Sequence, residues 1–191
     1  MEYKLYLFRH GQTYHNRDAI FSGWLDTKLT KRGIEDAKII ALRLKNKKID
    51  VAFQTRLIRS KDTLKYILRY HPECKKIILD DRMIERSYGT LSGNSHYNFV
   101  LKNNPKLYDT YHRSYETPPP KGESIKQVEK RVLSFIKDLI KFIKKNKVNV
   151  AISAHGNSMR PFRRYFEKLT IKQMLQLENP YDNYFEYTIK V

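Results

Sequence analysis

Two His-Gly pairs in this chain carry residue types that can do chemistry. His10-Gly11 follows the apolar run LYLFR, and His155-Gly156 follows the apolar run VNVAISA. A neutral imidazole is a nucleophile near physiological pH, and the guanidinium of Arg9 can match a phosphoryl group through paired hydrogen bonds. The glycine after each histidine lets the backbone turn tightly and leaves room for a ligand beside the ring. The pattern therefore indicates phosphoryl transfer through a phosphohistidine.

Two other interpretations of these residues are weighed against that one. An arginine beside a histidine is commonly part of a solvated loop, and this is the simpler interpretation of the first pair taken alone. A metal site would need a third ligand, and although His15 is near in the sequence, no HxxxH helix surrounds it. Metal binding is therefore the weaker hypothesis, and no metal is expected.

The sequence pattern also predicts the elements that must position the two histidines. Apolar residues recur at helical spacing over 30–46, 59–70, 124–143 and 157–166. Short apolar or alternating runs predict strands over 3–8, 51–53, 77–79, 148–153 and 184–191. This alternation predicts an α/β fold, a three-layer sandwich whose mostly parallel sheet has helices on both faces. The carboxyl ends of parallel strands open on one crevice, so both histidines should meet there.

The length of 191 residues fits a single domain, which we expect to span residues 1–191. Between Met83 and Gly122 the helical periodicity weakens, and three consecutive prolines stand at 118–120. We expect this segment to be a partly helical, lid-like excursion over the active site, at one edge of the sheet.

The chain is strongly basic, with 38 Lys and Arg residues against 20 Asp and Glu residues and a net charge of +18. Such a balance attracts polyanions, anionic membrane surfaces or small phosphorylated metabolites. The runs KNKK at 45–48 and KKNK at 144–147 close predicted helices, where cations complement the helix dipole and stay solvated. Much of the excess charge is therefore expected to serve solubility.

Several function classes are excluded or weakened by composition. No apolar run is long enough to span a bilayer, and Cys74 as the only cysteine excludes an internal disulfide, so we expect a soluble, cytoplasmic protein with no membrane partner. A nucleic-acid-binding module is the alternative suggested by the charge and by 14 tyrosines. No recognition-helix, RNP or KH pattern appears and the tyrosines are scattered, so no nucleic-acid partner is expected.

An ordered set of motifs gives a more specific indication. The segments RHGQTYHN, FSGWLDTKLTKRGIEDA, LIRSKDTL, ERSYGTLSG, PPPKGESI and AHGNSMR follow one another from Leu5 to about Arg160. This set resembles the histidine phosphatase superfamily and, within it, the cofactor-dependent phosphoglycerate mutases. The resemblance implies interconversion of 3-phosphoglycerate and 2-phosphoglycerate, primed by 2,3-bisphosphoglycerate and independent of metal.

The resemblance also implies catalytic roles for five residues of this chain. His10 would carry the phosphoryl group, Arg9 and Arg59 would bind its oxygens, and His155 would complete the pocket. Glu85 would act as general acid and base. Without the resemblance, the preferred interpretations would be a helix cap for Arg59 and a surface pair with Arg86 for Glu85.

A larger set of residues is implied to contact the small phosphorylated substrate: Asn16, Ser22, Gly23, Tyr88, His96, His112, Arg113, Gly156 and Asn157. The family clamps the substrate with a lysine and two arginines, and those positions fall here on His96, His112 and Arg113. Two fixed charges thus become titratable, and a histidine binds an anion more weakly at neutral pH. A phosphatase that passes the phosphoryl group to water is therefore the alternative function. The segment between Pro120 and Glu123 is shorter than in the longer, oligomeric mutases, which favours a monomer or a small homo-oligomer.

Overall fold

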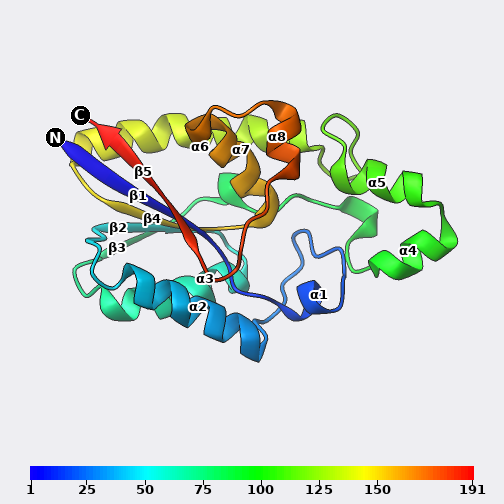
Figure 1. The fold of residues 1–191 in the computed structure, drawn as a ribbon, viewed down its shortest axis with the longest axis horizontal. Helices are drawn as coiled ribbons and strands as arrows, with labels where there is room; N and C mark the ends of the chain where they lie inside the picture. Colours follow the sequence, from blue (N-terminus) through cyan, green and yellow to red (C-terminus); the bar gives the residue numbers. More distant parts are fainter.

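The computed structural model describes residues 1–191, and its centre is a five-stranded sheet with the order β3-β2-β4-β1-β5. β1 to β4 run parallel and β5 pairs antiparallel with β1 at one edge. Figure 1 shows the sheet between two layers of helices. The predicted three-layer α/β architecture is confirmed. The strands are β1 (Glu2–Arg9), β2 (Val51–Gln54), β3 (Lys76–Leu79), β4 (Val150–Ala154) and β5 (Tyr184–Lys190).

The layer above the sheet in Figure 1 holds α6 (Ile125–Asn146), α7 (Gly156–Glu167) and the short α8 (Ile171–Gln176). α6 begins at a capping box in which Ser124 and Gln127 satisfy each other's backbone N–H groups. Its buried stripe of Val128, Val132, Phe135 and Ile136, among others, follows the helical period and joins the largest apolar cluster. This cluster also takes Leu5, Leu7, Ile152 and Phe162.

The layer below the sheet holds α2 (Lys31–Leu44), capped by Thr30, and α3 (Ile58–Ile67), which continues as the 3-10 turn η1 (Leu68–Tyr70). Because side chains alternate along a strand, β1 sends Tyr6 and Phe8 to this face and its leucines to the other. Tyr6 and Phe8 pack there with Ile40, Leu44 and Leu64. β1 is therefore buried on both faces, and its end at Arg9 is held in place from above and below.

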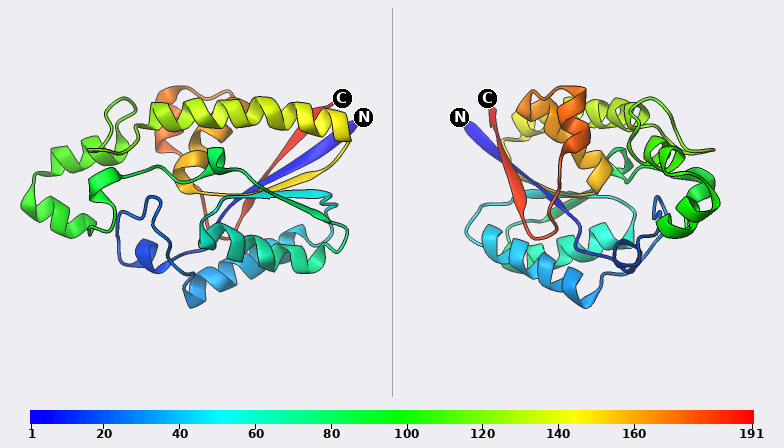
Figure 2. Two further views of the ribbon diagram at one scale, coloured as in Figure 1. Left: turned by 180° about the vertical axis from the view of Figure 1, so that it is seen from behind. Right: turned by 45° about the vertical axis from the view of Figure 1, so that its right-hand side comes forward.

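The predicted excursion leaves the sheet after β3 and returns at α6. It contains the 3-10 turns η2 (Asp81–Met83) and η3 (Gly89–Leu91) and the helices α4 (His96–Lys102) and α5 (Pro105–Arg113). Figures 1 and 2 place α4 and α5 beyond the carboxyl ends of the strands, on the same side as α1 (Tyr14–Arg17). The helical excursion expected over the site is therefore confirmed, and it lies beyond the carboxyl ends of the strands rather than alongside the edge strands β3 and β5.

The excursion has an apolar cluster of its own. Phe21, Tyr88, Leu91 and Phe99 are buried together, and tyrosines of α5 pack against them. Phe21 comes from the loop after α1, so this cluster fastens the excursion to the segment that follows the first histidine.

Two element boundaries differ from the sequence pattern for a local reason. β4 starts at Val150 rather than at 148, because the backbone of Asn149 bonds Asp50 and Val51 and its side chain accepts from the Lys4 N–H. α8 was not predicted, since six residues carry too little periodicity. No helix of the protein is both long and apolar enough to cross a membrane.

Candidate active site

The two histidines meet because their strands are neighbours. β1 and β4 pair in parallel with Arg9 opposite Ala154, so the next residue of each strand leaves the sheet at the same level. The His10 N–H donates to the Ala154 carbonyl at 3.1 Å, and the two ring centroids lie 5.0 Å apart. Both side chains are almost fully buried, with exposed fractions of 2% and 0%. The predicted meeting of the imidazoles is confirmed.

His10 is held in one tautomer. Its Nδ1 lies 2.8 Å from the carbonyl oxygen of Gly11, and since a carbonyl only accepts, Nδ1 carries the proton and Nε2 keeps its lone pair. Burial, followed by the charges of Arg59 and Arg9, lowers the pKa of His10 well below its usual 6.5. The ring is therefore neutral at pH 7, with Nε2 free to attack an electrophile.

The backbone after His10 is packed tightly against α2. The Gly11 N–H donates to the hydroxyl of Thr63 at 3.0 Å, and that hydroxyl donates to the Arg59 carbonyl. A Cβ at Gly11 would lie 2.1 Å from the carbonyl oxygen of Gly33, so no larger residue fits there without displacing α2. The glycine is thus required by close packing of two backbones.

His155 begins the turn into α7. Its Nε2 lies 2.8 Å from the hydroxyl of Thr55, which follows β2, and burial and then the Arg59 charge lower the pKa of His155 well below 6.5. The site therefore holds two neutral imidazoles.

Two arginines face the histidines without a carboxylate partner. Arg59, 1% exposed on α3, donates to the carbonyls of Gly23 and Leu25, both at 2.8 Å. Arg9 donates to the Asn179 carbonyl at 3.1 Å, and its guanidinium carbon lies 4.0 Å from the ring centroid of Tyr181. The ion pairs that arginines form in this protein involve other residues. The positive charges of Arg9 and Arg59 are therefore not neutralised by a carboxylate and act on the cavity. Arg59 does not act as a helix cap.

Glu85 lies in the same site and is 8% exposed. Its Oε1 accepts from the backbone N–H groups of Arg86 at 2.8 Å and Asn157 at 3.2 Å, the second of these at the start of α7. The indole N–H of Trp24 donates to the Glu85 carbonyl at 2.7 Å. Glu85 therefore does not pair with the Arg86 guanidinium at the surface. Backbone bonds hold its carboxylate toward the cavity.

The donor set around His10 was tested for a metal. Ligand atoms of His10, Glu85 and His155 lie within 4.8 Å of one another, a separation that a metal ion could bridge. The guanidiniums of Arg9 and Arg59 face the same space, and they stabilise an anion there and disfavour a cation. The charge distribution fits a phosphoryl group better than a metal ion.

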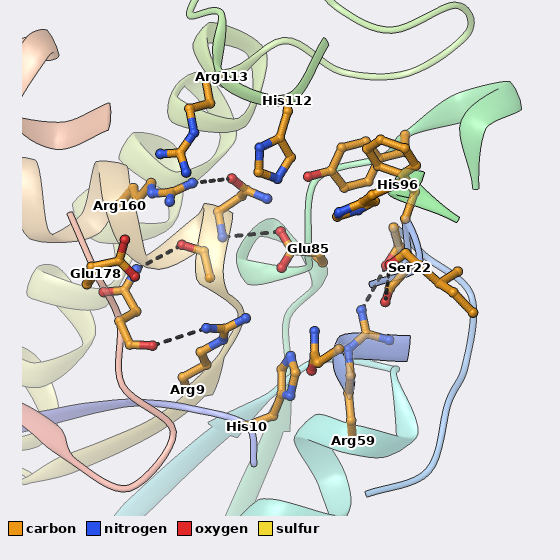
Figure 3. Close-up of a pocket in the computed structure, with 18 residues that line it drawn as sticks. Arg9, His10, Ser22, Arg59, Glu85, His96, His112, Arg113, Arg160 and Glu178 are labelled. Carbon is orange, nitrogen blue, oxygen red and sulfur yellow. Dashed lines mark hydrogen bonds between the residues drawn. The ribbon is translucent and has the colours of Figure 1, made fainter. Parts of the chain in front are cut away.

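A single cavity of about 250 Å³ opens over these residues. Figure 3 shows His10, Arg9 and Arg59 at its lower end, which we call the near end, and His96, His112 and Arg113 at its upper end, the far end. Glu85 lies between the two ends. The predicted site residues that line the cavity are Arg9, His10, Asn16, Ser22, Gly23, Arg59, Glu85, Tyr88, His96, His112, Arg113, Gly156 and Asn157. His155 is fully buried next to His10 and does not line the cavity.

Sequence reasoning missed five lining residues: Ile20, Phe21, Arg160, Glu178 and Asn179. Arg160 stands one helical turn after Asn157 on α7 and donates to its side-chain oxygen at 2.8 Å, so the helical spacing could have revealed it. Glu178 and Asn179 lie in the loop between α8 and β5, where no periodicity singles out a residue.

Comparison with known proteins agrees with this geometry. The model of the histidine phosphatase superfamily (branch 1) matches residues 5–189. The chain is 32% identical to the 2,3-bisphosphoglycerate-dependent phosphoglycerate mutase of Methanococcus vannielii, over 92% of this chain and 86% of that one. It is 36% identical to the enzyme of the same name from Parvibaculum lavamentivorans, over 91% and 84% of the two chains.

Among solved structures, a mycobacterial glucosyl-3-phosphoglycerate phosphatase superposes with a TM-score of 0.83, at 21% identity and over 98% of this chain and 91% of that one. At that identity the likeness concerns the fold alone. The family match, however, spans both strand ends that carry the histidines and nearly all of the chain between them. The chain therefore belongs to the histidine phosphatase superfamily.

Proposed function

We propose that this protein is a phosphoglycerate mutase that interconverts 3-phosphoglycerate and 2-phosphoglycerate through a phosphohistidine on His10, primed by 2,3-bisphosphoglycerate. One observation carries the proposal. Arginines without carboxylate partners stand at both ends of one small cavity, Arg9 and Arg59 at the near end and Arg113 and Arg160 at the far end. Such a cavity fits a short ligand with an anionic group at each end. The names of the curated relatives support the same reaction.

One half-reaction transfers a phosphoryl group from a bisphosphate to the protein and leaves a phosphoglycerate. Nε2 of His10 attacks the phosphorus atom held at the near end, and the bond between phosphorus and the ester oxygen breaks. Glu85 gives its proton to the departing oxygen. Arg9 and Arg59 stabilise the charge on the phosphoryl oxygens, with His155, Asn16 and Asn157 as further hydrogen-bond partners.

The other half-reaction passes the phosphoryl group from His10 to the free hydroxyl of a phosphoglycerate, which forms the bisphosphate. The oxygen of that hydroxyl attacks phosphorus, Glu85 takes the proton, and the bond to Nε2 breaks, so His10 is neutral again. The primer supplies the phosphoryl group that His10 must carry before the first turnover. Isomerisation needs this bisphosphate to stay bound and to turn before its other phosphate reacts with His10, and Arg113 and Arg160 would hold an anionic group that is not reacting.

A second candidate function is hydrolysis of small phosphomonoesters, with water in place of the hydroxyl. The observation that favours it is the far end, where His96 and His112 lie among aromatic rings and carry a lowered pKa, because burial disfavours their charged forms.

Incubation with 2,3-bisphosphoglycerate and 3-phosphoglycerate, followed by ³¹P NMR, separates the two functions. We expect 2-phosphoglycerate to form and an acid-labile phosphoryl group to appear on the protein. The variant His10→Ala should lose that label, whereas His71→Gln, outside the cavity, should keep it. Release of inorganic phosphate with no 2-phosphoglycerate would reject the mutase, and a label that survives in His10→Ala would reject the site.

A further inference from the structure

One wall of the far end is built from imidazole and aromatic rings. His96, the first residue of α4, has its ring centroid 4.0 Å from that of Phe21 and 5.4 Å from that of His112. His112, on α5, stacks on Tyr108 with centroids 5.0 Å apart and ring planes at 21°. The Tyr108 hydroxyl lies 3.2 Å from Nδ1 of His96. Figure 3 shows both imidazoles facing the cavity, so we call His96 and His112 the imidazole wall.

The surroundings keep this wall uncharged at neutral pH. Burial, and then the charges of His96, Arg86, Arg113 and Arg160, lowers the pKa of His112 to about 3. Burial also lowers the pKa of His96. The fixed charges that act on His112 are the three arginines, and no carboxylate pairs with either ring. Protonation of the imidazole wall is thus opposed by both burial and repulsion.

The opposite wall of the far end is cationic. Arg113 and Arg160 line it, and Arg160 donates to the Asn157 side-chain oxygen at 2.8 Å and to the Leu177 carbonyl at 3.3 Å. Neither arginine has a carboxylate partner. One anionic group can therefore be held by these two arginines. A second anionic group at the far end would meet only neutral imidazoles, and hydrogen bonds from neutral donors are about half as strong as charge-assisted ones.

This asymmetry matters for a ligand that carries more than two anionic groups. The bisphosphate formed between the two proposed half-reactions has two phosphates and a carboxylate, and one phosphate occupies the near end. The two remaining groups then share a far end with two guanidiniums on one side only. Retention of this ligand should be weak compared with retention in a fully cationic far end.

We propose that the imidazole wall determines how the phosphoryl group on His10 is divided between a retained hydroxyl and water. This inference rests on the proposed phosphohistidine chemistry. When the acidic ligand leaves early, a water oxygen attacks phosphorus, the bond to Nε2 breaks and Glu85 accepts the proton, which yields inorganic phosphate and neutral His10. The wall also admits an uncharged, hydroxyl-bearing group, because a neutral imidazole both donates and accepts hydrogen bonds. The substrate class thus extends to phosphomonoesters whose far group is a neutral alcohol.

The test introduces fixed charge into the wall. His96→Lys with His112→Arg should raise the ratio of 2-phosphoglycerate to inorganic phosphate, and lower the concentration of 2,3-bisphosphoglycerate needed for half-maximal labelling, by about tenfold each, a factor that corresponds to ~1.4 kcal/mol. His96→Gln with His112→Gln is the matched uncharged control, and its product ratio should stay low even where its turnover falls. If circular dichroism shows that the charged pair is unfolded, His112→Arg alone takes its place, and the same rise in the ratio of 2-phosphoglycerate to inorganic phosphate is expected.

A second measurement uses two substrates that differ only at the far group. The wild-type protein should hydrolyse glycerol 3-phosphate as well as 3-phosphoglycerate, which Arg113 and Arg160 favour, and the charged pair should increase the preference for the carboxylate by about a further tenfold. An unchanged product ratio in the folded charged variant, or an equal change in the glutamine control, would overturn the inference while leaving the phosphohistidine in place. Absence of any label on wild-type His10 would instead reject the proposed function itself.

Discussion

The near end and the far end of the cavity are built in different ways. The near end is formed where β1 and β4 leave the sheet, and His10, His155 and Arg59 there are at most 2% exposed and held by hydrogen bonds to backbone or hydroxyl groups. The imidazole wall of the far end lies on the short helices α4 and α5, which pack on a separate apolar cluster. The difference indicates that the sheet supports the chemistry and the excursion supports selectivity.

The largest expected effect tests the group between the two ends. Glu85→Gln keeps the shape of the side chain but cannot give or take a proton, so kcat should fall by roughly 10²–10⁴-fold. Rapid-quench labelling with 2,3-bisphosphoglycerate measures the step directly. His96→Gln is the uncharged polar change at the far end, and it should alter KM more than the rate of labelling. Equal losses of labelling rate in both variants would remove the distinction between the ends.

An arginine from each end sharpens the same comparison. Arg59→Gln should slow labelling of His10 by roughly 10²–10³-fold, since it removes a charge that stabilises the transferring group. Arg113→Gln should mainly raise KM for phosphoglycerate, by about tenfold, because its charge acts on the group that does not react. Initial-rate kinetics separate the two effects. A change in kcat alone for Arg113→Gln would place that residue in the chemical step.

The pH dependence of stability should show the burial of the near-end histidines. Their pKa values are lowered in the folded protein, so below about pH 6.5 the unfolded chain binds protons that His10 and His155 do not. The free energy of unfolding should therefore fall with decreasing pH, by about 1.4 kcal/mol per pH unit for each of the two histidines.

Urea unfolding between pH 7.5 and pH 5.5 measures this slope. Replacing His10 and His155 with glutamine should flatten it, because both pKa values lie well below 6.5 in the folded protein. The same replacement of His96 and His112 should flatten it as well, since burial also lowers their pKa values. A slope that neither double variant changes would mean that the imidazoles at both ends take up protons in the folded protein as they do in the unfolded chain.

The smallest effect on the chemistry is expected from the core of the excursion. Phe99→Ala removes a ring from the small cluster with Phe21 and Tyr88, and it should destabilise the excursion locally. Limited proteolysis within residues 94–122 should become faster while His10 is still labelled at close to the wild-type rate. Loss of labelling in step with proteolysis would show that the near end depends on the excursion for its shape.

Much of the fold follows from local patterns. The strand expected at 3–8 is β1, that at 51–53 is β2 and that at 184–191 is β5, each within one or two residues. These predictions hold because each strand or helix buries an apolar face of its own, and the spacing of apolar residues within one continuous stretch of sequence defines that face. The start of β4 was misplaced because the bonds that hold Asn149 come from residues about 100 and 145 positions away.

The site residues also fall into those that local sequence motifs predict and those that only the fold brings to the cavity. The near-end candidates are chemically distinctive and lie in short motifs, and the structure brings them together. Glu178 was missed because no local signal marks a residue that reaches a cavity from an irregular loop, whereas the helical spacing of Arg160 from Asn157 was a signal that could have been used. The sequence also left undecided which group Glu85 bonds. A carboxylate that precedes an arginine can pair with the guanidinium or accept from the arginine's backbone N–H, and Glu85 does the second.

From its sequence alone, this protein is an α/β chain with a histidine at the end of each of two strands, because periodicity and residue type are local properties. The tertiary structure decided that the strands are neighbours, that the arginines around the cavity have no carboxylate partners, and that the imidazole wall is neutral. Charge state and pairing depend on burial and on groups distant along the chain, and only the folded chain brings those together.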